Sequence, residues 1–272
     1  MNERNESPGI RITVLASGSK GNATVISDGV TSVLVDTGLS AKETARRMAL
    51  AGLFPEELSA VIVTHEHRDH VIGVGPFCRR HKVAAFMTRE TLQGARPIVG
   101  VLPAVEHFRC GRAFSVGTLS FRPFSTSHDA ADPMGFTLEA CGIKIGMVTD
   151  LGVATSMVAH HLTGCRALIL EANHDPKMLE QGPYPWSLKQ RVASRIGHLS
   201  NEDARDLLGR VLNPGMTHII LGHLSETNNL PEKAMDVVSQ ALSGHRARLL
   251  AARQKEITDI FVQLESAPPA AK

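Results

Sequence analysis

The 272-residue sequence has little cysteine, few aromatic side chains and no long hydrophobic run. Its cysteines, Cys78, Cys110, Cys141 and Cys165, are far apart and form no C-x-x-C pair, which excludes a disulfide framework and a cysteine-bound zinc motif. No apolar stretch approaches the ~18 residues that span a bilayer, and the charged N-terminal residues lack the apolar core of a secretory signal. We therefore expect a reduced, soluble protein of the cytoplasm that does not associate with membranes.

The sequence also lacks an excess of either charge. Its 29 Lys and Arg residues and 27 Asp and Glu residues give a formal net charge of +2. No global basic field therefore predicts a nucleic-acid or membrane partner. Since neither a linker nor a repeat interrupts the chain, we expect one domain at residues 10–265. Disordered ends are predicted at residues 1–9 and 266–272.

Residues 65–70 carry the strongest chemical motif in the sequence. They read HEHRDH and directly follow an apolar run that predicts a buried strand. At this composition such a pattern arises by chance in roughly one chain in a thousand, so we discount the alternative of a solvated polar loop. The potential metal ligands are His65, His67, Asp69 and His70. Imidazoles and a carboxylate without thiolates favour zinc, manganese or iron.

The apolar patterns predict a mixed α/β (α+β) fold. Strands are expected near 10–16, 24–27, 32–36, 60–64, 83–87, 119–124, 135–140, 143–148, 167–170, 218–221 and 257–262, and helices near 41–51, 70–80, 188–196, 202–211 and 231–242. Early strands form hairpins with glycine turns, and later segments alternate strand and helix. This mixture indicates two sheets packed face to face with helices outside. The glycine-rich segment 17–22 lacks P-loop spacing and is interpreted as a tight loop that could lie beside a site at strand ends.

Three further candidate ligands each follow a predicted strand: His128, Asp150 and His223. Strand ends present side chains rigidly, as a metal site requires. Taken alone, each is weak evidence, because a polar residue at a strand end commonly has only a structural role. Together with the first string they make seven ligands, which suit two ions that share a carboxylate. We assign His65, His67 and His128 to one ion, Asp69, His70 and His223 to the other, and Asp150 as the bridge.

This whole pattern resembles the metallo-β-lactamase superfamily over roughly residues 10–263. The resemblance implies a four-layer αββα sandwich with two divalent ions, zinc or manganese, at one rim of the sheets. At the position of His67 the redox-active flavodiiron members carry glutamate, so the imidazole here favours hydrolysis. The absence of cysteine among the predicted ligands disfavours an antibiotic-hydrolysing role.

The charge of such a site favours an anionic substrate. Two divalent ions, two aspartates and one bridging hydroxide sum to about +1 in a pocket of low dielectric constant. That charge would attract a phosphodiester, and the hydroxide would serve as the nucleophile. It does not exclude a thioester or lactone, whose tetrahedral oxyanion would gain similarly.

Segments 170–173, 197–204 and 221–225 resemble motifs of the tRNase Z nucleases. The resemblance implies that His198 donates a proton to the leaving oxygen and that Glu171 orients it, with Asp69 also at the catalytic centre. The alternative places His198 structurally, just before a helix N-cap at Ser200. The two interpretations are compatible, because a helix N-terminus also attracts phosphate.

The closest resemblance is to the WalJ/YycJ-type subgroup of the superfamily, on strings such as LASGSKGNAT, SHDAADPMGF and EANHDPKMLEQGPYP. It covers nearly the whole chain and implies a dinuclear metal-dependent phosphodiesterase, a 5′ to 3′ exonuclease on DNA rather than RNA. The chain is too short for a β-CASP insertion. The alternatives are an RNA-processing nuclease, a thioester or lactone hydrolase of the same fold, and a binding protein whose metals only hold the fold.

Several residues near the predicted rim are candidates for substrate contact: His174, Lys189, Ser200 and Asn201. The single tyrosine and single tryptophan, Tyr184 and Trp186, lie together in one short segment. They are expected either to stack on a terminal base or to pack the loop that carries them.

Overall fold

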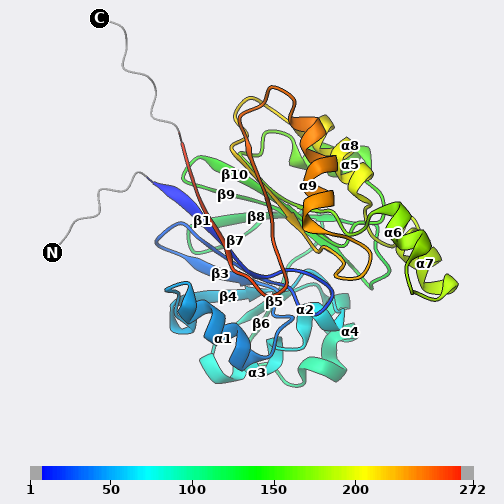
Figure 1. Ribbon diagram of the computed structural model, residues 1–272. Helices are drawn as coiled ribbons and strands as arrows, with labels where there is room; N and C mark the ends of the chain where they lie inside the picture. The colour runs from blue at the N-terminus through cyan, green and yellow to red at the C-terminus, as the bar shows by residue number, and fades with distance from the viewer. Residues whose placement is uncertain (1–7, 265–272) are drawn as a thin grey trace, which may run out of the picture.

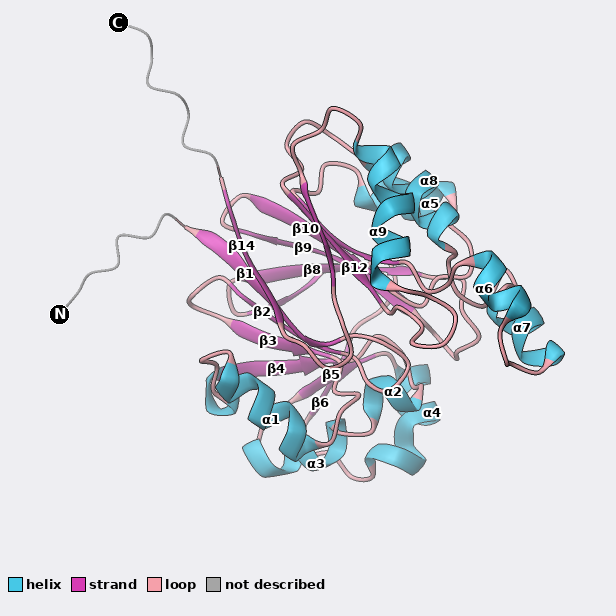
Figure 2. Cartoon of the chain, in the orientation of Figure 1, coloured by secondary structure: helices cyan, strands magenta, loops and turns pink. Residues whose placement is uncertain are grey.

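The computed structural model describes residues 8–264. Within them, two seven-stranded sheets pack face to face, with helices on both outer faces (Figure 1) (Figure 2). This confirms the predicted αββα sandwich. The predicted tail at residues 266–272 and most of the predicted N-terminal segment lie outside the described residues. Among residues 8–264, no helix combines the length and apolar character that crossing a bilayer requires.

The first sheet has the strand order β14-β1-β2-β3-β4-β5-β6. Its strands are β1 (Gly9–Ala16), β2 (Ala23–Ser27), β3 (Ser32–Val35), β4 (Leu58–Ile62), β5 (Ala85–Met87), β6 (Val105–His107) and β14 (Thr258–Gln263). The outer face is covered by the helices α1 (Ala41–Leu50), α2 (Arg68–Val71), α3 (Val74–His81) and α4 (Arg89–Val99), and a 3-10 turn, η1 (Pro55–Glu57), precedes β4.

The second sheet has the order β13-β12-β11-β10-β9-β8-β7. Its strands are β7 (Phe114–Val116), β8 (Leu119–Ser125), β9 (Met134–Ala140), β10 (Ile143–Val148), β11 (Ala167–Glu171), β12 (His218–Gly222) and β13 (Arg248–Ala251). Its outer face is covered by α5 (Ser156–Leu162), α8 (Asn201–Val211) and α9 (Pro231–Ser239), which continues into η2 (Gln240–Leu242). The short helices α6 (Pro176–Gln181) and α7 (Trp186–Val192) lie at one end of this layer (Figure 1).

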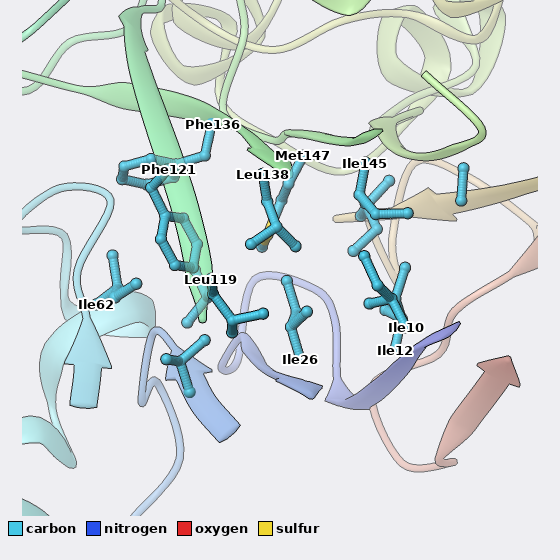
Figure 3. Close-up of a cluster of buried hydrophobic side chains, with 14 of the residues drawn as sticks. Ile10, Ile12, Ile26, Ile62, Leu119, Phe121, Phe136, Leu138, Ile145 and Met147 are labelled. Carbon is cyan, nitrogen blue, oxygen red and sulfur yellow. The ribbon is translucent and has the colours of Figure 1, made fainter. Parts of the chain in front are cut away.

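The main core lies between the sheets. Side chains from both sheets, including Ile10, Ile26, Phe121, Leu138 and Ile145, point toward one another there (Figure 3). A separate apolar cluster lies under the helices of each layer. Because strands such as β11 and β12 are covered on both faces, they are buried at nearly every position rather than at alternate ones. Each fully buried aliphatic side chain stabilises this core by about 1.5–3 kcal/mol.

Strand direction brings the predicted ligands together. In the first sheet β1, β3, β4, β5 and β6 run the same way, and in the second sheet β8, β10, β11, β12 and β13 do so. Residues after these strands therefore lie along one rim of each sheet. Hydrogen bonds join the two rims: His223 N donates to Ser17 Oγ at 2.7 Å, and Met134 N donates to the Thr64 carbonyl at 3.1 Å.

Candidate metal centre

The 65–70 segment leaves β4 and turns directly into α2. Thr64 and His65 are buried after the strand, His67 is the N-cap of α2, and Asp69 and His70 lie in its only turn. The turn rests on the loop after β3, because Thr37 N donates to the His70 carbonyl at 2.8 Å. Strand end, cap and helical turn therefore bring the four side chains close together, His65 and His67 in one group and Asp69 and His70 in another.

The first group of converging atoms comes from His65, His67 and His128. His67 Nδ1 lies 3.1 Å from His65 Nε2 and 3.1 Å from His128 Nε2. The three potential ligand atoms all lie within 4.8 Å of one another. Two nitrogens bound to one tetrahedral zinc ion are about 3.3 Å apart. The spacing of these imidazoles therefore fits a shared divalent metal.

The second group comes from Asp69, His70 and His223. Asp69 Oδ2 lies 3.3 Å from His223 Nε2 and 3.6 Å from His70 Nε2. These ligand atoms also lie within 4.8 Å of one another. One carboxylate and two imidazoles form a donor set suited to zinc or manganese.

Asp150 lies between the two groups. Its Oδ1 is 3.6 Å from His128 Nε2 and 3.4 Å from His223 Nδ1, and its Oδ2 is 3.3 Å from His70 Nε2, so the carboxylate lies close to residues of both groups. The residue is only 3% exposed, and Oδ2 is buried without a hydrogen-bond donor. An unpaired buried carboxylate oxygen is costly. A cation at this point would remove that cost, so the residues present fit a bound metal.

Hydrogen bonds behind the imidazoles fix their ring orientation. His70 Nδ1 donates to Asp36 Oδ2 at 2.7 Å, and His128 Nδ1 donates to the Gly197 carbonyl at 3.0 Å. Thr64 Oγ1 donates to Asp36 Oδ2 at 2.9 Å and lies 3.0 Å from His65 Nδ1. These partners bind the other ring nitrogen, so that Nε2 of each ring faces the converging atoms, as at metal sites generally.

Sequence reasoning missed this supporting set. Asp36 follows β3 and is fully buried, but a single aspartate after a strand forms no motif. The glycine-rich loop 17–22 is placed beside the site, as the sequence allowed. Asn22 Nδ2 lies 3.3 Å from Asp69 Oδ2 and 3.1 Å from His70 Nε2.

Glu171 joins His198 to the site. It is fully buried at the end of β11, and its Oε1 accepts hydrogen bonds from His198 Nδ1 at 2.8 Å and from His223 Nδ1 at 2.9 Å. Its Oε2 accepts from the backbone N–H groups of Leu151 at 2.8 Å and Leu199 at 3.1 Å. Burial raises the pKa of Glu171, but His198 and His223 lower it by more. The net effect holds this pKa below its usual value, so the group is a carboxylate.

The electrostatics divide the histidines into two kinds. Burial and the neighbouring imidazoles hold the pKa of His65 well below its usual value, so this ring is neutral. Burial also lowers the pKa of His70, but Asp150, Asp36 and Asp69 outweigh it and raise that pKa to about 9. Negative charge therefore gathers around Asp150, where a cation would be stabilised.

The residues predicted to contact the substrate lie in different environments: a helix cap, a buried position and the surface. Ser200 caps α8: its Oγ accepts from Asp203 N at 3.1 Å and donates to Asp203 Oδ2 at 2.7 Å. His174 is buried, and its carbonyl accepts from Asn201 N at 2.9 Å. Lys189 lies on α7 at the surface, where its Nζ donates to the Glu180 carbonyl.

The structure contradicts the prediction that Asn201 contacts the substrate. Its side chain is fully buried and exchanges two amide hydrogen bonds with Asn229, at 3.0 and 2.9 Å. No surface of the side chain is left for a substrate. The residue holds the start of α8 against the segment that carries His223, which is a structural role.

A cavity of about 180 Å³ opens beside His198. Its walls include Ser19, Asp129, Tyr184 and Arg191. The cavity therefore lies between His198 and the α6–α7 segment, and it borders on Asp129, the residue after His128.

A family model and the curated relatives place this chain in the same family. The model of the beta-lactamase superfamily domain matches residues 31–220. The chain is 36% identical over 236 residues to Exodeoxyribonuclease YycJ of Bacillus anthracis, covering 86% of this chain and 89% of the relative. It is 35% identical over 237 residues to Exodeoxyribonuclease WalJ of Streptococcus pneumoniae, covering 85% of this chain and 88% of the relative.

Solved structures share the fold at much lower identity. The metallo-beta-lactamase fold protein YhfI from Bacillus subtilis aligns with a TM-score of 0.72 and 14% identity, over 92% of this chain and 99% of that one. Zinc-bound PqqB from Methylobacterium extorquens aligns with a TM-score of 0.69 and 16% identity, over 92% of this chain and 100% of that one. The short form of human tRNase Z aligns with a TM-score of 0.64 and 13% identity, over 91% of this chain and 98% of that one.

Proposed function

Because this chain belongs to the metallo-β-lactamase superfamily, in the group of the YycJ and WalJ exodeoxyribonucleases, we propose that it is a metal-dependent DNA exonuclease. The observation that carries the proposal is the arrangement around Asp150, with a group of metal-ligating atoms on each side and the Glu171–His198 pair adjacent. Such a site can hold a phosphodiester and protonate its leaving group.

The proposed ligands of the first ion are His65, His67 and His128. Those of the second are Asp69, His70 and His223, and Asp150 is shared. We propose two zinc or manganese ions, since imidazole and carboxylate accept both. When bound, the ions would activate water and offset the charge that develops on the phosphate.

His198 is the proposed proton donor. Its Nδ1 is held by Glu171 at 2.8 Å, which leaves Nε2 to face the leaving oxygen. An alkoxide leaves poorly unless it is protonated, and the carboxylate of Glu171 holds the imidazole in the orientation from which it can donate the proton. Asp69 is partly exposed, and its Oδ2 lies 3.3 Å from Nε2 of His223, which is also hydrogen-bonded to Glu171, so Asp69 is proposed to contribute to the reacting centre.

We propose that digestion runs 5′ to 3′ and that DNA is preferred to RNA. The names of the two relatives support DNA as the substrate. The N-terminus of α8, capped by Ser200, carries a partial positive charge that suits a phosphate. Lys189, on the surface of α7, is a further proposed substrate contact, whereas His174 is buried, as Asn201 is, and is not proposed to touch the substrate.

The test is digestion of end-labelled single- and double-stranded DNA and RNA with each candidate metal. We expect release of mononucleotides from the 5′ end of DNA in the presence of manganese or zinc. The Asp69→Asn and His198→Ala proteins should release little, and Glu57→Gln, an exposed residue of η1, should behave as wild type. Equal digestion by all four proteins would indicate a contaminating nuclease. Turnover of thioesters or lactones with DNA untouched would refute the proposal.

A further inference from the structure

The segment between Glu171 and His198 forms an arm that projects at one end of the second layer (Figure 1). We call residues 176–197, which contain α6 and α7, the α6–α7 arm. Since Glu171 and His198 are hydrogen-bonded at 2.8 Å, the arm is closed at its base by the proposed proton-donor pair. Anything bound along the arm therefore leads directly to the reacting centre.

The arm exposes apolar surface that no other described part of the chain covers. Helix α7 buries none of its residues. Trp186 is 68% exposed at its first position, and Ile196 is half exposed. Of the two interpretations of Trp186 that the sequence left open, packing of the loop is therefore excluded. Tyr184 is half-buried and lines the cavity beside His198.

Charge and composition of the arm indicate the chemistry of its ligand. The arm holds the only tryptophan and the only tyrosine of the chain. It also carries Lys177, Lys189, Arg191 and Arg195 against the single acid Glu180, a formal charge of +3 on a chain whose total is +2. Aromatic rings interleaved with basic side chains are typical of surfaces that bind single-stranded nucleic acid.

The C-terminal half of the arm is tied to the metal-facing loop. The Arg191 guanidinium donates to Asp129, the residue after His128. Asp129 N in turn donates to the Ile196 carbonyl at 3.1 Å, and His198 N donates to the Val192 carbonyl at 2.9 Å. These bonds fix the direction of the arm relative to the site, so it is a platform of defined position.

We propose that the α6–α7 arm binds an unpaired end of DNA, with a base stacked on Tyr184 in the cavity and a second base on Trp186. Base faces inside a duplex are covered by their neighbours, so exposed aromatic rings at this position select unpaired nucleotides. The exposed basic side chains Lys177 and Arg195 contact the phosphates, since Arg191 is bound to Asp129 and Lys189 to the Glu180 carbonyl. This inference rests on the proposed function and deepens it, because it defines the form of DNA that the site accepts.

Trp186 provides the test, since the emission of this single tryptophan reports directly on its own environment. The metal-loaded protein is titrated with a short phosphorothioate oligothymidylate, which resists cleavage. We expect saturable quenching of the tryptophan emission. An abasic oligomer of equal length and a blunt duplex should leave the emission unchanged. Equal quenching by the abasic oligomer would overturn base stacking, and equal quenching by the duplex would overturn selection of unpaired ends.

Variants provide a second measurement, by anisotropy of a labelled oligothymidylate. Trp186→Ala and Tyr184→Ala should each weaken binding at least about 5-fold, whereas Trp186→Phe and Tyr184→Phe should restore most of it. Phe54→Ala is the matched control, because it removes a 54% exposed aromatic ring next to η1. Unchanged affinity in both alanine variants would overturn the inference.

The two proposals fail in different ways. End-labelled DNA is digested with the same preparation of wild-type protein. Digestion without quenching would refute the role of the arm and leave the nuclease standing. Quenching without digestion would refute the proposed nuclease and support the arm as a binding surface for unpaired DNA.

Discussion

Asp36, Asp150 and His223 share an unusual backbone conformation, with φ values of 60°, 59° and 54°. Left-handed φ is unfavourable for residues other than glycine, and such strain persists only where the surroundings enforce it. Each of the three follows a strand of the common rim. The chain therefore accepts local strain to turn these side chains toward one another, which supports a shared functional role.

The proposed role of His198 can be separated from binding by the choice of leaving group. His198→Ala should reduce cleavage of DNA by about 10²–10⁴-fold, because the departing alkoxide needs a proton. The loss should be under about 10-fold on thymidine 5′-(p-nitrophenyl phosphate), whose phenolate leaves unprotonated. Steady-state rates on both substrates give the comparison.

The control for that variant is His160→Ala, an exposed imidazole on α5. It should match wild type on both substrates. Equal losses for His198→Ala on the two substrates would show that the residue does not act as a proton donor.

The cysteines provide a test at sites away from the rim. Burial raises the pKa of the Cys78 and Cys165 thiols to about 12. A raised pKa keeps these thiols protonated and unreactive at pH 8, whereas Cys110 and Cys141 are exposed. Ellman's reagent should therefore modify two thiols per folded chain, and all four in denaturant. Rapid reaction of four thiols in the folded protein would contradict the buried placement.

At this scale the sequence indicated which side chains converge at the rim better than it indicated the residues that support them. The 65–70 string and the later strand-end residues could be recognised because they form a spaced pattern. Asp36, Asn22 and Thr64 could not, since each is a single polar residue whose partner is distant in sequence. The assignment of individual ligands and of His198 stays a prediction until metal binding is measured.

At the scale of the elements, α2 and the loop after β3 approach each other closely at Gly38. A Cβ atom on Gly38 would lie 1.6 Å from the Asp69 carbonyl oxygen and 2.6 Å from Asn22 N, both backbone atoms. Only glycine therefore allows the loop to approach the turn that carries Asp69 and His70. The geometry of the second group of ligands depends on this contact.

Gly38→Ala should consequently destabilise the protein on the order of 3 kcal/mol and weaken metal binding. Gly209→Ala is the control: it lies within α8 with open space around the added methyl, and it should stabilise by about 0.5–1 kcal/mol. Urea unfolding and metal titration of both variants provide the measurement. A Gly38→Ala protein as stable as wild type would contradict the close approach.

Most elements could be predicted from apolar runs, and the failures have physical causes. The helix expected at 70–80 is two helices, because Gly73 breaks it where the chain packs on the Leu39 carbonyl. Strands β6, β7 and β13 were missed since they are three or four residues long and hold few buried side chains. Helix α4 was missed because Gly94 and Pro97 interrupt its pattern.

At the scale of the molecule, the rim is built by both sheets. Predicted ligands from the first sheet face His128, Asp150 and His223 from the second, so metal binding would join the two layers. A ligand that binds only the folded state stabilises it by RT ln(1 + [L]/Kd), about 4 kcal/mol at a thousandfold excess over Kd.

Removal of metal should therefore lower the melting temperature by on the order of 10 °C. Scanning calorimetry of the protein before and after treatment with a chelator measures this shift, and re-addition of manganese or zinc should reverse it. An unchanged melting temperature would show that the two layers do not depend on a bound ion.

The layered fold was predictable as a whole because two lines of sequence evidence agreed: alternating strand and helix patterns, and a ligand motif that resembles one superfamily. The α6–α7 arm was not, because exposure of Trp186 depends on what surrounds it in space. Periodicity over a short segment rich in proline and glycine carries little information about packing.

The number of divalent ions bound per chain tests the central claim most directly. The protein is loaded with manganese or zinc, freed of excess metal and measured by inductively coupled plasma mass spectrometry. We predict two ions per chain in the wild-type protein, and one or fewer when Asp150 is replaced by alanine. A single ion, or none, in the wild-type protein would contradict the account.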